Sequence, residues 1–199
     1  MDVVASLEAV VHSVWLLPAL VLMIAIDGPV PMLPSETLLM TAAAVAFADG
    51  DAGMLVGLFV AAVLGSVAGD VLTYGLGRSS NRLIAGSSTG SCSTWVRRHL
   101  LKRPGPVLVG ARFVPGGRLV STAAAGRFGL RLRRFVPWSL ASSAAWSAYM
   151  LVVGRLLEPM TGGDPVLCVV GAAVLAVLTA ALFAIARRLL RRRNTVTVQ

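Results

Sequence analysis

The stretch GARFVPGGR, residues Gly110–Arg118, decides the fold that the sequence predicts. It places Arg112 and Arg118 on either side of a Pro-Gly-Gly break, inside a segment, residues 104–126, that is otherwise apolar. Proline removes a backbone donor and glycine weakens a helix, so a continuous helix cannot run through this break. At membrane depth, broken backbone and arginine side chains survive only where protein or a water-filled cavity surrounds them. We therefore expect the rest of the protein to enclose residues 104–126.

The composition predicts an integral membrane protein. The chain of 199 residues is 56% hydrophobic and only 14% charged, and its mean hydropathy is +0.80, which excludes an ordinary soluble domain. Its net charge is +9, yet none of the 18 Lys and Arg residues precedes Arg78. Basic groups placed between apolar runs are typical of cytoplasmic loops beside anionic lipid, and no aromatic platforms accompany them, so we expect no nucleic-acid partner.

The apolar runs predict an all-helical fold with about four transmembrane helices and two re-entrant helical hairpins. Pro29, Pro31 and Pro34 forbid a continuous helix ahead of Glu36, although the residues that follow are too apolar for a loop. We interpret residues 27–48 as the first hairpin. In this single membrane domain we expect transmembrane helices at residues 10–26, 54–76, 135–154 and 165–186, hairpins at 27–48 and 104–126, a cytoplasmic basic loop at 79–103 and a cytoplasmic basic tail at 187–199.

The flanking charges orient the two hairpins. Lys102 and Arg103 precede residues 104–126 and four arginines follow at residues 127–134, so both ends of this hairpin belong in the cytoplasm. The first hairpin then enters from the opposite side, which predicts an inverted repeat. The echo between residues 33–45 and 114–126 at a constant offset of 81 supports it, because it matches the Pro and the Thr-Ala-Ala-Ala of both segments.

Helix 54–76 carries a stripe of small residues at four-residue spacing, which predicts close packing against other helices. Asp70 lies on the same helix, one turn before Tyr74 and two turns before Arg78. It could pair with Arg78 near the membrane surface, or it could take part in function, and the residues leave both interpretations open.

The two hairpins bring acids towards arginines. If their breaks meet near the midplane, Asp27 and Glu36 approach Arg112 and Arg118. Burial favours the protonated form of a carboxylate and a nearby arginine favours the charged form, so either acid could carry protons. The planar fork of arginine suits a phosphate group. The sequence thus predicts phosphate binding by the arginines and proton exchange by the acids, and the alternative is buried ion pairs that only tie the hairpins together.

Three motifs in order resemble the DedA family, also called VTT-domain or SNARE-associated Golgi proteins. Residues 27–39 are similar to its E-N-x-x-x-P-x-P-G-E-x-x-L, residues 69–78 to its G-D-x-x-x-Y-x-x-G-R, and residues 110–118 to its G-R-F-x-P-x-x-R. The resemblance covers about residues 20–157. Asp27, Gly28 and Ser35 stand where the family pattern has Glu, Asn and Gly.

The resemblance implies a polytopic protein of the bacterial inner membrane that moves lipids between leaflets. It implies a flippase for undecaprenyl phosphate, another polyisoprenyl phosphate or a related phospholipid, driven by protons. From the basic tail and the predicted topology we expect both termini in the cytoplasm. The alternative is a passive scramblase or an envelope-maintenance protein without ion coupling. We expect that the protein is not an enzyme and that it binds no cofactor or metal. The sequence does not decide whether it forms a homo-oligomer. The implied site consists of phosphate-binding Arg112 and Arg118, proton-coupling Asp27 and Glu36, and supporting Asp70, Tyr74, Arg78, Pro34, Pro115 and Gly116.

Overall fold

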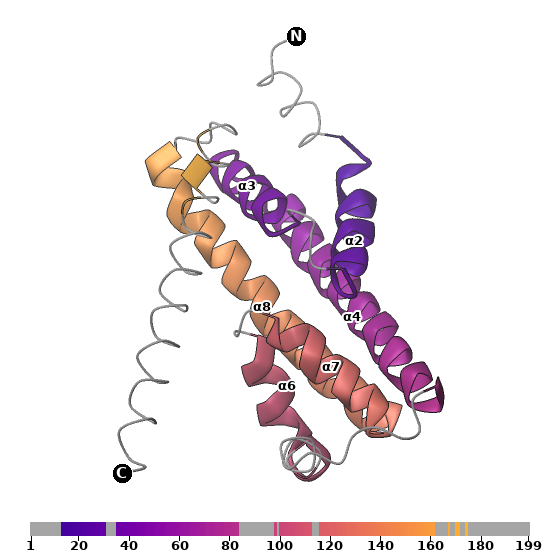
Figure 1. Cartoon of the computed structure of the whole chain (residues 1–199). Helices are drawn as coiled ribbons and strands as arrows, with labels where there is room; N and C mark the ends of the chain where they lie inside the picture. Colours follow the sequence, from indigo (N-terminus) through magenta and orange to yellow (C-terminus); the bar gives the residue numbers. More distant parts are fainter. Residues whose placement is uncertain are drawn as a thin grey trace, which may run out of the picture.

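The computed structural model describes residues 13–30, 35–83, 98, 100–112, 116–161, 167, 170, 171 and 174. Predictions for residues 1–12, for most of the 79–103 loop and the 165–186 helix, for the 187–199 tail, and for Pro34 and Pro115 lie outside these residues. All secondary-structure elements in the described part of the chain are helices, as predicted. Its helices are α2 (Leu16–Asp27), α3 (Ser35–Ala48), α4 (Ala52–Leu83), α6 (Pro104–Arg112), α7 (Gly117–Arg127) and α8 (Leu132–Thr161) (Figure 1).

Two long antiparallel helices, α4 and α8, form the frame. Ser143 of α8 donates a hydrogen bond to Ser66 of α4, and Ser139 of α8 donates one to Asp70 of α4. Residue numbers therefore increase in opposite directions along the two helices. Residues Ala52–Ser80 of α4 are long and apolar enough to cross a membrane, with a hydropathy of 2.2. The predicted helix 54–76 lies inside α4, which continues to Leu83 and so takes up the first residues of the predicted basic loop.

Two helices, α2 and α3, precede α4, and the predicted helix 10–26 and hairpin 27–48 stay predictions. Helix α2 runs parallel to α4, because Leu17 faces Gly57 and Ala25 faces Gly69. Its 12 residues are about 18 Å long, too short for a core of about 30 Å. The chain then reverses, and Ser35, the first residue of α3, bonds back to Asp27. The hairpin shape is therefore α2 followed by α3, and its insertion into a membrane stays a prediction.

A second hairpin shape consists of α6 and α7. Helix α6 runs parallel to α8, since Gly105 faces Trp138 and Arg112 faces Trp146. Helix α7 runs back along α4, from a contact of Arg118 near Ser66 to one of Ala123 with Gly77 (Figure 1). Gly116 caps α7 with a φ of 72°, a left-handed conformation that disfavours any residue with a Cβ.

The two halves of the chain pack in a crossed arrangement. In the first half α3 lies against α8, while in the second half α7 lies against α4. Both contacts depend on a glycine: a Cβ on Gly77 would collide with the carbonyl of Ala123, and a Cβ on Gly154 would lie 3.0 Å from the carbonyl oxygen of Met40. An arginine follows each of these glycines in the sequence. The inverted repeat itself stays a prediction.

The stripe of small residues on α4 serves two neighbours, as the sequence predicted. A Cβ on Gly65 would lie 2.7 Å from the carbonyl oxygen of Val21 in α2. Further along the stripe, Gly77 contacts α7 instead. Helix α4, like α8, therefore contacts both hairpins.

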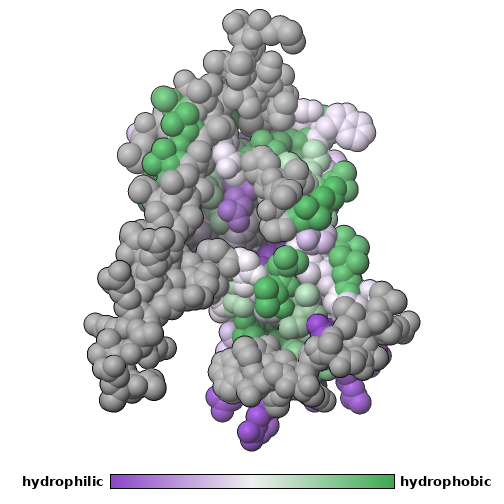
Figure 2. All heavy atoms as spheres, in the orientation of Figure 1, coloured by the Kyte–Doolittle hydropathy of each residue, from purple (hydrophilic) through white to green (hydrophobic). Residues whose placement is uncertain are grey.

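Helix α4 exposes apolar side chains and buries polar ones, the opposite of a helix on the surface of a protein in water. On α4 the side chains of Val56 and Leu76 are 64% and 60% exposed, whereas Ser66 and Asp70 are buried. Hydrocarbon tolerates such an apolar surface, while water opposes it. Figure 2 shows hydrophilic side chains at the lower end of the molecule, where α6 begins and α7 meets α8. This distribution is that of a membrane protein.

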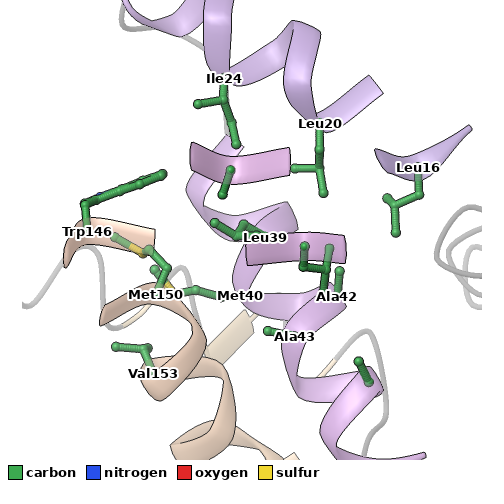
Figure 3. Packing of buried hydrophobic residues seen from close by; sticks show 13 residues of the cluster. Leu16, Leu20, Ile24, Leu39, Met40, Ala42, Ala43, Trp146, Met150 and Val153 are labelled. Carbon is green, nitrogen blue, oxygen red and sulfur yellow. The ribbon is translucent and has the colours of Figure 1, made fainter. Parts of the chain in front are cut away.

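Apolar packing holds the upper half of the molecule together. Leu20 and Ile24 of α2 meet Leu39 of α3, and Trp146 and Met150 of α8 close the cluster (Figure 3). A second apolar cluster around Phe135 and Tyr74 lies in the lower half, where their rings stack with centroids 4.9 Å apart. The polar residues described below lie between these two clusters.

Candidate functional site

Asp70 joins both arginines of the second hairpin. Arg112 Nη1 donates to Asp70 Oδ2 at 3.1 Å, and Arg118 Nε donates to Asp70 Oδ1 at 2.8 Å. The side chains of Arg112 and Asp70 are 3% and 4% exposed, and that of Arg118 is 20% exposed. Each carboxylate oxygen thus serves a different arginine. The trio carries a formal charge of +1, because two cations share one anion.

Backbone and hydroxyl groups complete this arrangement. Arg118 Nη2 donates to the carbonyl oxygen of Ser66 at 3.0 Å, and Arg112 Nη2 donates to the Ser66 hydroxyl. Ser139 Oγ donates to Asp70 Oδ2 at 2.6 Å. We call Ser66, Asp70, Arg112, Arg118 and Ser139 the Asp70 cluster. It connects α4, α6, α7 and α8, so it fixes where the tip of the second hairpin lies.

The Arg112 guanidinium lies against the upper apolar cluster. Its Cζ is 5.3 Å from the ring centroid of Trp146, which provides a cation–π contact. Its Nε is buried and has no hydrogen-bond partner among the described residues. One donor of this arginine is therefore unused in the conformation described.

A small cavity adjoins the Asp70 cluster. Its volume is about 10 Å³, close to the lower limit for one water molecule. The hydroxyl of Ser142 is buried beside it and, within the described part of the chain, makes no hydrogen bond. A phosphate group, with its several oxygens, needs more room than this. The cavity is lined by Asp70, Leu108, Arg112, Arg118, Ser121, Thr122, Phe135, Ser139 and Ser142.

The acids of the first hairpin approach the same place. Glu36, in the first turn of α3, interacts electrostatically with Asp27, Arg118 and Arg112. A Cβ on Gly69 would lie 3.1 Å from Arg118 Nη2 and 3.2 Å from Gly28 Cα, which places the end of α2 beside that arginine. The structure thus brings together the four residues that the sequence analysis paired, at the tips of two opposed hairpins.

Asp27, at the end of α2, is hydrogen-bonded to Ser35, the first residue of α3. The hydroxyl of Ser35 donates to Asp27 Oδ2 at 3.3 Å, and Ser35 is buried. The bond spans the interval in which the sequence has Pro31 and Pro34. Ser35 therefore links α2 to α3 at the hairpin tip.

Tyr74 and Arg78 act at a different point from Asp70. The Tyr74 hydroxyl donates to the carbonyl oxygen of Leu130 at 2.5 Å and accepts from Arg78 Nη1 at 3.3 Å. The sequence left two interpretations open for Asp70, and the pairing with Arg78 is wrong. Among the described residues, Asp70 pairs with Arg112 and Arg118, and Arg78 donates to Tyr74. Tyr74 and Arg78 secure the turn between α7 and α8.

A family model, the VTT domain, matches residues 33–156. The match covers more than half of the chain and includes both arginines, Glu36 and Asp70, while Asp27 precedes it. The chain belongs to the VTT domain family. The VTT domain is the domain of the DedA and SNARE-associated proteins, which are membrane proteins implicated in lipid and membrane function. No curated protein and no solved structure matches this VTT-domain chain.

Sequence reasoning found the ionisable residues of this VTT-domain protein but missed its hydroxyl groups as partners. The sequence analysis gave no role to Ser66, Ser139 or Ser143. Their buried positions on facing sides of α4 and α8 make them hydrogen-bond partners of Asp70, of Arg112 or of one another. Their recurrence within apolar helices was the available signal.

Proposed function

We propose that this protein moves a lipid with a phosphate head group between membrane leaflets, and that Arg112 and Arg118 bind the phosphate. The observation that carries the proposal is the pair of arginines side by side at a helix break, almost enclosed by protein. An arginine fork pairs well with phosphate oxygens, and the low dielectric of the surroundings strengthens that attraction. These two arginines would suit a phosphate head group, and the family to which the chain belongs is implicated in lipid function.

The lipid we propose is undecaprenyl phosphate, another polyisoprenyl phosphate or a related phospholipid. These molecules combine a phosphate with apolar chains. The exposed apolar faces of α4 and α8 would let such chains remain in hydrocarbon while the phosphate approaches the arginines. We propose transport, with no chemical change in the lipid.

We propose further that Glu36 and Asp27 exchange protons during transport. Both acids belong to the hairpin tip opposite the arginines, and Glu36 interacts electrostatically with both guanidinium groups. Loss of a positive partner favours the neutral form of a buried carboxylate, whereas its return favours the charged form. Movement of one hairpin tip relative to the other would thus release or bind a proton.

The proposed cycle has two openings. The conformation described is closed, because the cavity beside the arginines accommodates no phosphate. Hairpin α2–α3 and hairpin α6–α7 approach this point from opposite ends of the α4–α8 frame. Displacement of either hairpin would expose the arginines to one side only, which is alternating access around a central site.

Reconstituted transport tests the proposal. Vesicles containing the full chain and a fluorescent undecaprenyl phosphate are treated with a membrane-impermeant quencher, and the rate at which the inner-leaflet label becomes accessible is measured. Arg112→Lys and Arg118→Lys should each slow transport, because lysine keeps the charge but lacks the planar fork. Transport at the parent rate by both variants would refute phosphate recognition by these arginines.

The proton component needs its own comparison. Glu36→Gln and Asp27→Asn should abolish the response of transport to an imposed pH gradient. Asp49→Asn removes an equal charge from an exposed position at the end of α3 and is the matched control. If Glu36→Gln and Asp27→Asn respond to the gradient as the parent does, the protein is a passive scramblase and proton coupling is excluded.

A further inference from the structure

We propose that Asp70 is an internal counter-anion that exchanges with the lipid phosphate on Arg112 and Arg118. The inference rests on the proposed function, because it concerns the same two arginines. In the closed conformation, Asp70 occupies the place that a phosphate would take, and each of its oxygens accepts from one arginine. The arginines are thus never left without an anion between transport events.

Burial makes such a counter-anion necessary. An unpaired guanidinium surrounded by protein and hydrocarbon loses its hydration without compensation. Arg112 is almost fully enclosed, with Trp146 on one side and Asp70 on another. A site with two cations and no anion would be unstable whenever lipid is absent. Asp70 removes that penalty and keeps the empty protein folded.

Space makes the two anions mutually exclusive. The cavity of about 10 Å³ that Asp70 lines with both arginines holds at most one water molecule. A phosphate can reach the arginines only if the contact between Asp70 and at least one of them opens. Binding of lipid phosphate and release of Asp70 are therefore the same event.

The cluster also holds donors in reserve for the incoming ligand. Arg112 Nε and the Ser142 hydroxyl are both buried beside this cavity, and neither has a hydrogen-bond partner among the described residues. Asp70 already accepts from Arg112, Arg118 and Ser139. A phosphate has more acceptor oxygens than a carboxylate, so it can use donors that Asp70 leaves unsatisfied. This difference gives the lipid the means to displace Asp70.

Ser139 determines how strongly Asp70 competes with the lipid phosphate for the two arginines. Its hydroxyl donates to Asp70 Oδ2, the same oxygen that accepts from Arg112, at 2.6 Å. This bond holds the carboxylate from the side of α8 in the position in which it accepts from both arginines. Without this hydroxyl the carboxylate would be held less firmly against the arginines, and a phosphate would displace it more easily. Ser139 is thus a positioning residue for the exchange.

Two consequences follow for Asp70→Asn. The neutral amide keeps an oxygen that can accept from the arginines but no longer competes as an anion. The variant should therefore bind a lipid phosphate more tightly than the parent, by about tenfold to a hundredfold for the loss of one charge at contact distance. It should also transport more slowly, because nothing displaces the phosphate at the end of the cycle.

The test uses the purified full-length chain in detergent. Farnesyl phosphate is the probe, farnesol is the control without a phosphate, and affinity is measured by calorimetry together with the shift in the thermal unfolding midpoint. We expect Asp70→Asn to have a lower midpoint than the parent without ligand, a larger increase with farnesyl phosphate, and a tighter Kd. Asp49→Asn should match the parent in all three quantities.

The outcomes separate this inference from the proposed function. Farnesyl phosphate binding by the parent, with equal or weaker binding by Asp70→Asn, would overturn the exchange and leave the phosphate site standing. No binding by either protein would reject the phosphate site itself and the exchange with it. Should Asp70→Asn fail to fold, Ser139→Ala provides the measurement: it should bind farnesyl phosphate more tightly than the parent, and weaker or equal binding would refute the exchange.

Discussion

The contact between α4 and α7 should be intolerant of a single added methyl group. A Cβ on Gly77 would collide with the carbonyl oxygen of Ala123 and lie 2.8 Å from its carbonyl carbon and its Cα. These are backbone atoms, so the collision is relieved only if the helices separate. We expect Gly77→Ala to lower the free energy of unfolding by about 1–3 kcal/mol, the usual cost of overpacking.

The chain offers a matched control two residues away on the same helix. A Cβ on Gly75 would meet no atom of the described residues within 4 Å. Gly75→Ala should therefore gain the helix propensity of alanine and raise the stability by up to about 1 kcal/mol. The two substitutions introduce the same atom into the same helix, and opposite signs are expected because only Gly77 faces α7.

Function provides a second readout of this pair. Separation of α7 from α4 would draw Arg118 away from Asp70, so Gly77→Ala should also slow lipid transport while Gly75→Ala does not. Unfolding is followed in detergent by tryptophan fluorescence during heating, and transport by the vesicle assay described above. Equal stability and equal transport for Gly77→Ala and Gly75→Ala would show that α4 and α7 are not in the contact described.

Three further substitutions probe single features. Tyr74→Phe removes the hydroxyl that bonds to Leu130, so it should cost about 1–2 kcal/mol of unfolding free energy in the same fluorescence assay, and an unchanged midpoint would contradict that bond. Gly116→Ala places a Cβ at a φ of 72°, so a loss of about 1–2 kcal/mol is expected, with Gly116→Asn closer to the parent. Ser35→Ala removes the donor to Asp27, so the dependence of transport on a pH gradient should weaken while transport without a gradient persists.

Much of the fold follows from where the backbone breaks. Local residues predict the breaks, because proline and paired glycines act on their own turn of helix. The contacts of the small-residue stripe on α4 were likewise predictable, since close approach needs small side chains. Hydropathy does not decide whether an apolar run such as residues 10–26 is a full span or an arm of a hairpin, because both have the same hydropathy.

The partner of Asp70 shows the limit of local reasoning. Arg78 is near in sequence, whereas Arg112 and Arg118 are brought close only by the packing of α6 and α7 against α4 and α8. A balance of charge at membrane depth was the signal that could have found them, because a buried carboxylate needs a cation at its own depth. The recurrence of Gly-Arg at residues 77–78 and 154–155 was also visible in the sequence.

The crossed packing of the two halves has a consequence for synthesis. Helix α3 leaves the ribosome long before α8, yet its Met40 and Ala43 pack against Gly154 of α8. Until α8 is inserted, the face formed by these residues is exposed to lipid, to α4 or to the insertion machinery. A shorter delay separates α4 from α7, whose Ala123 contacts Gly77. Neither half holds a complete core of its own, so the polypeptide acquires its native packing only after the last of these helices has entered the bilayer.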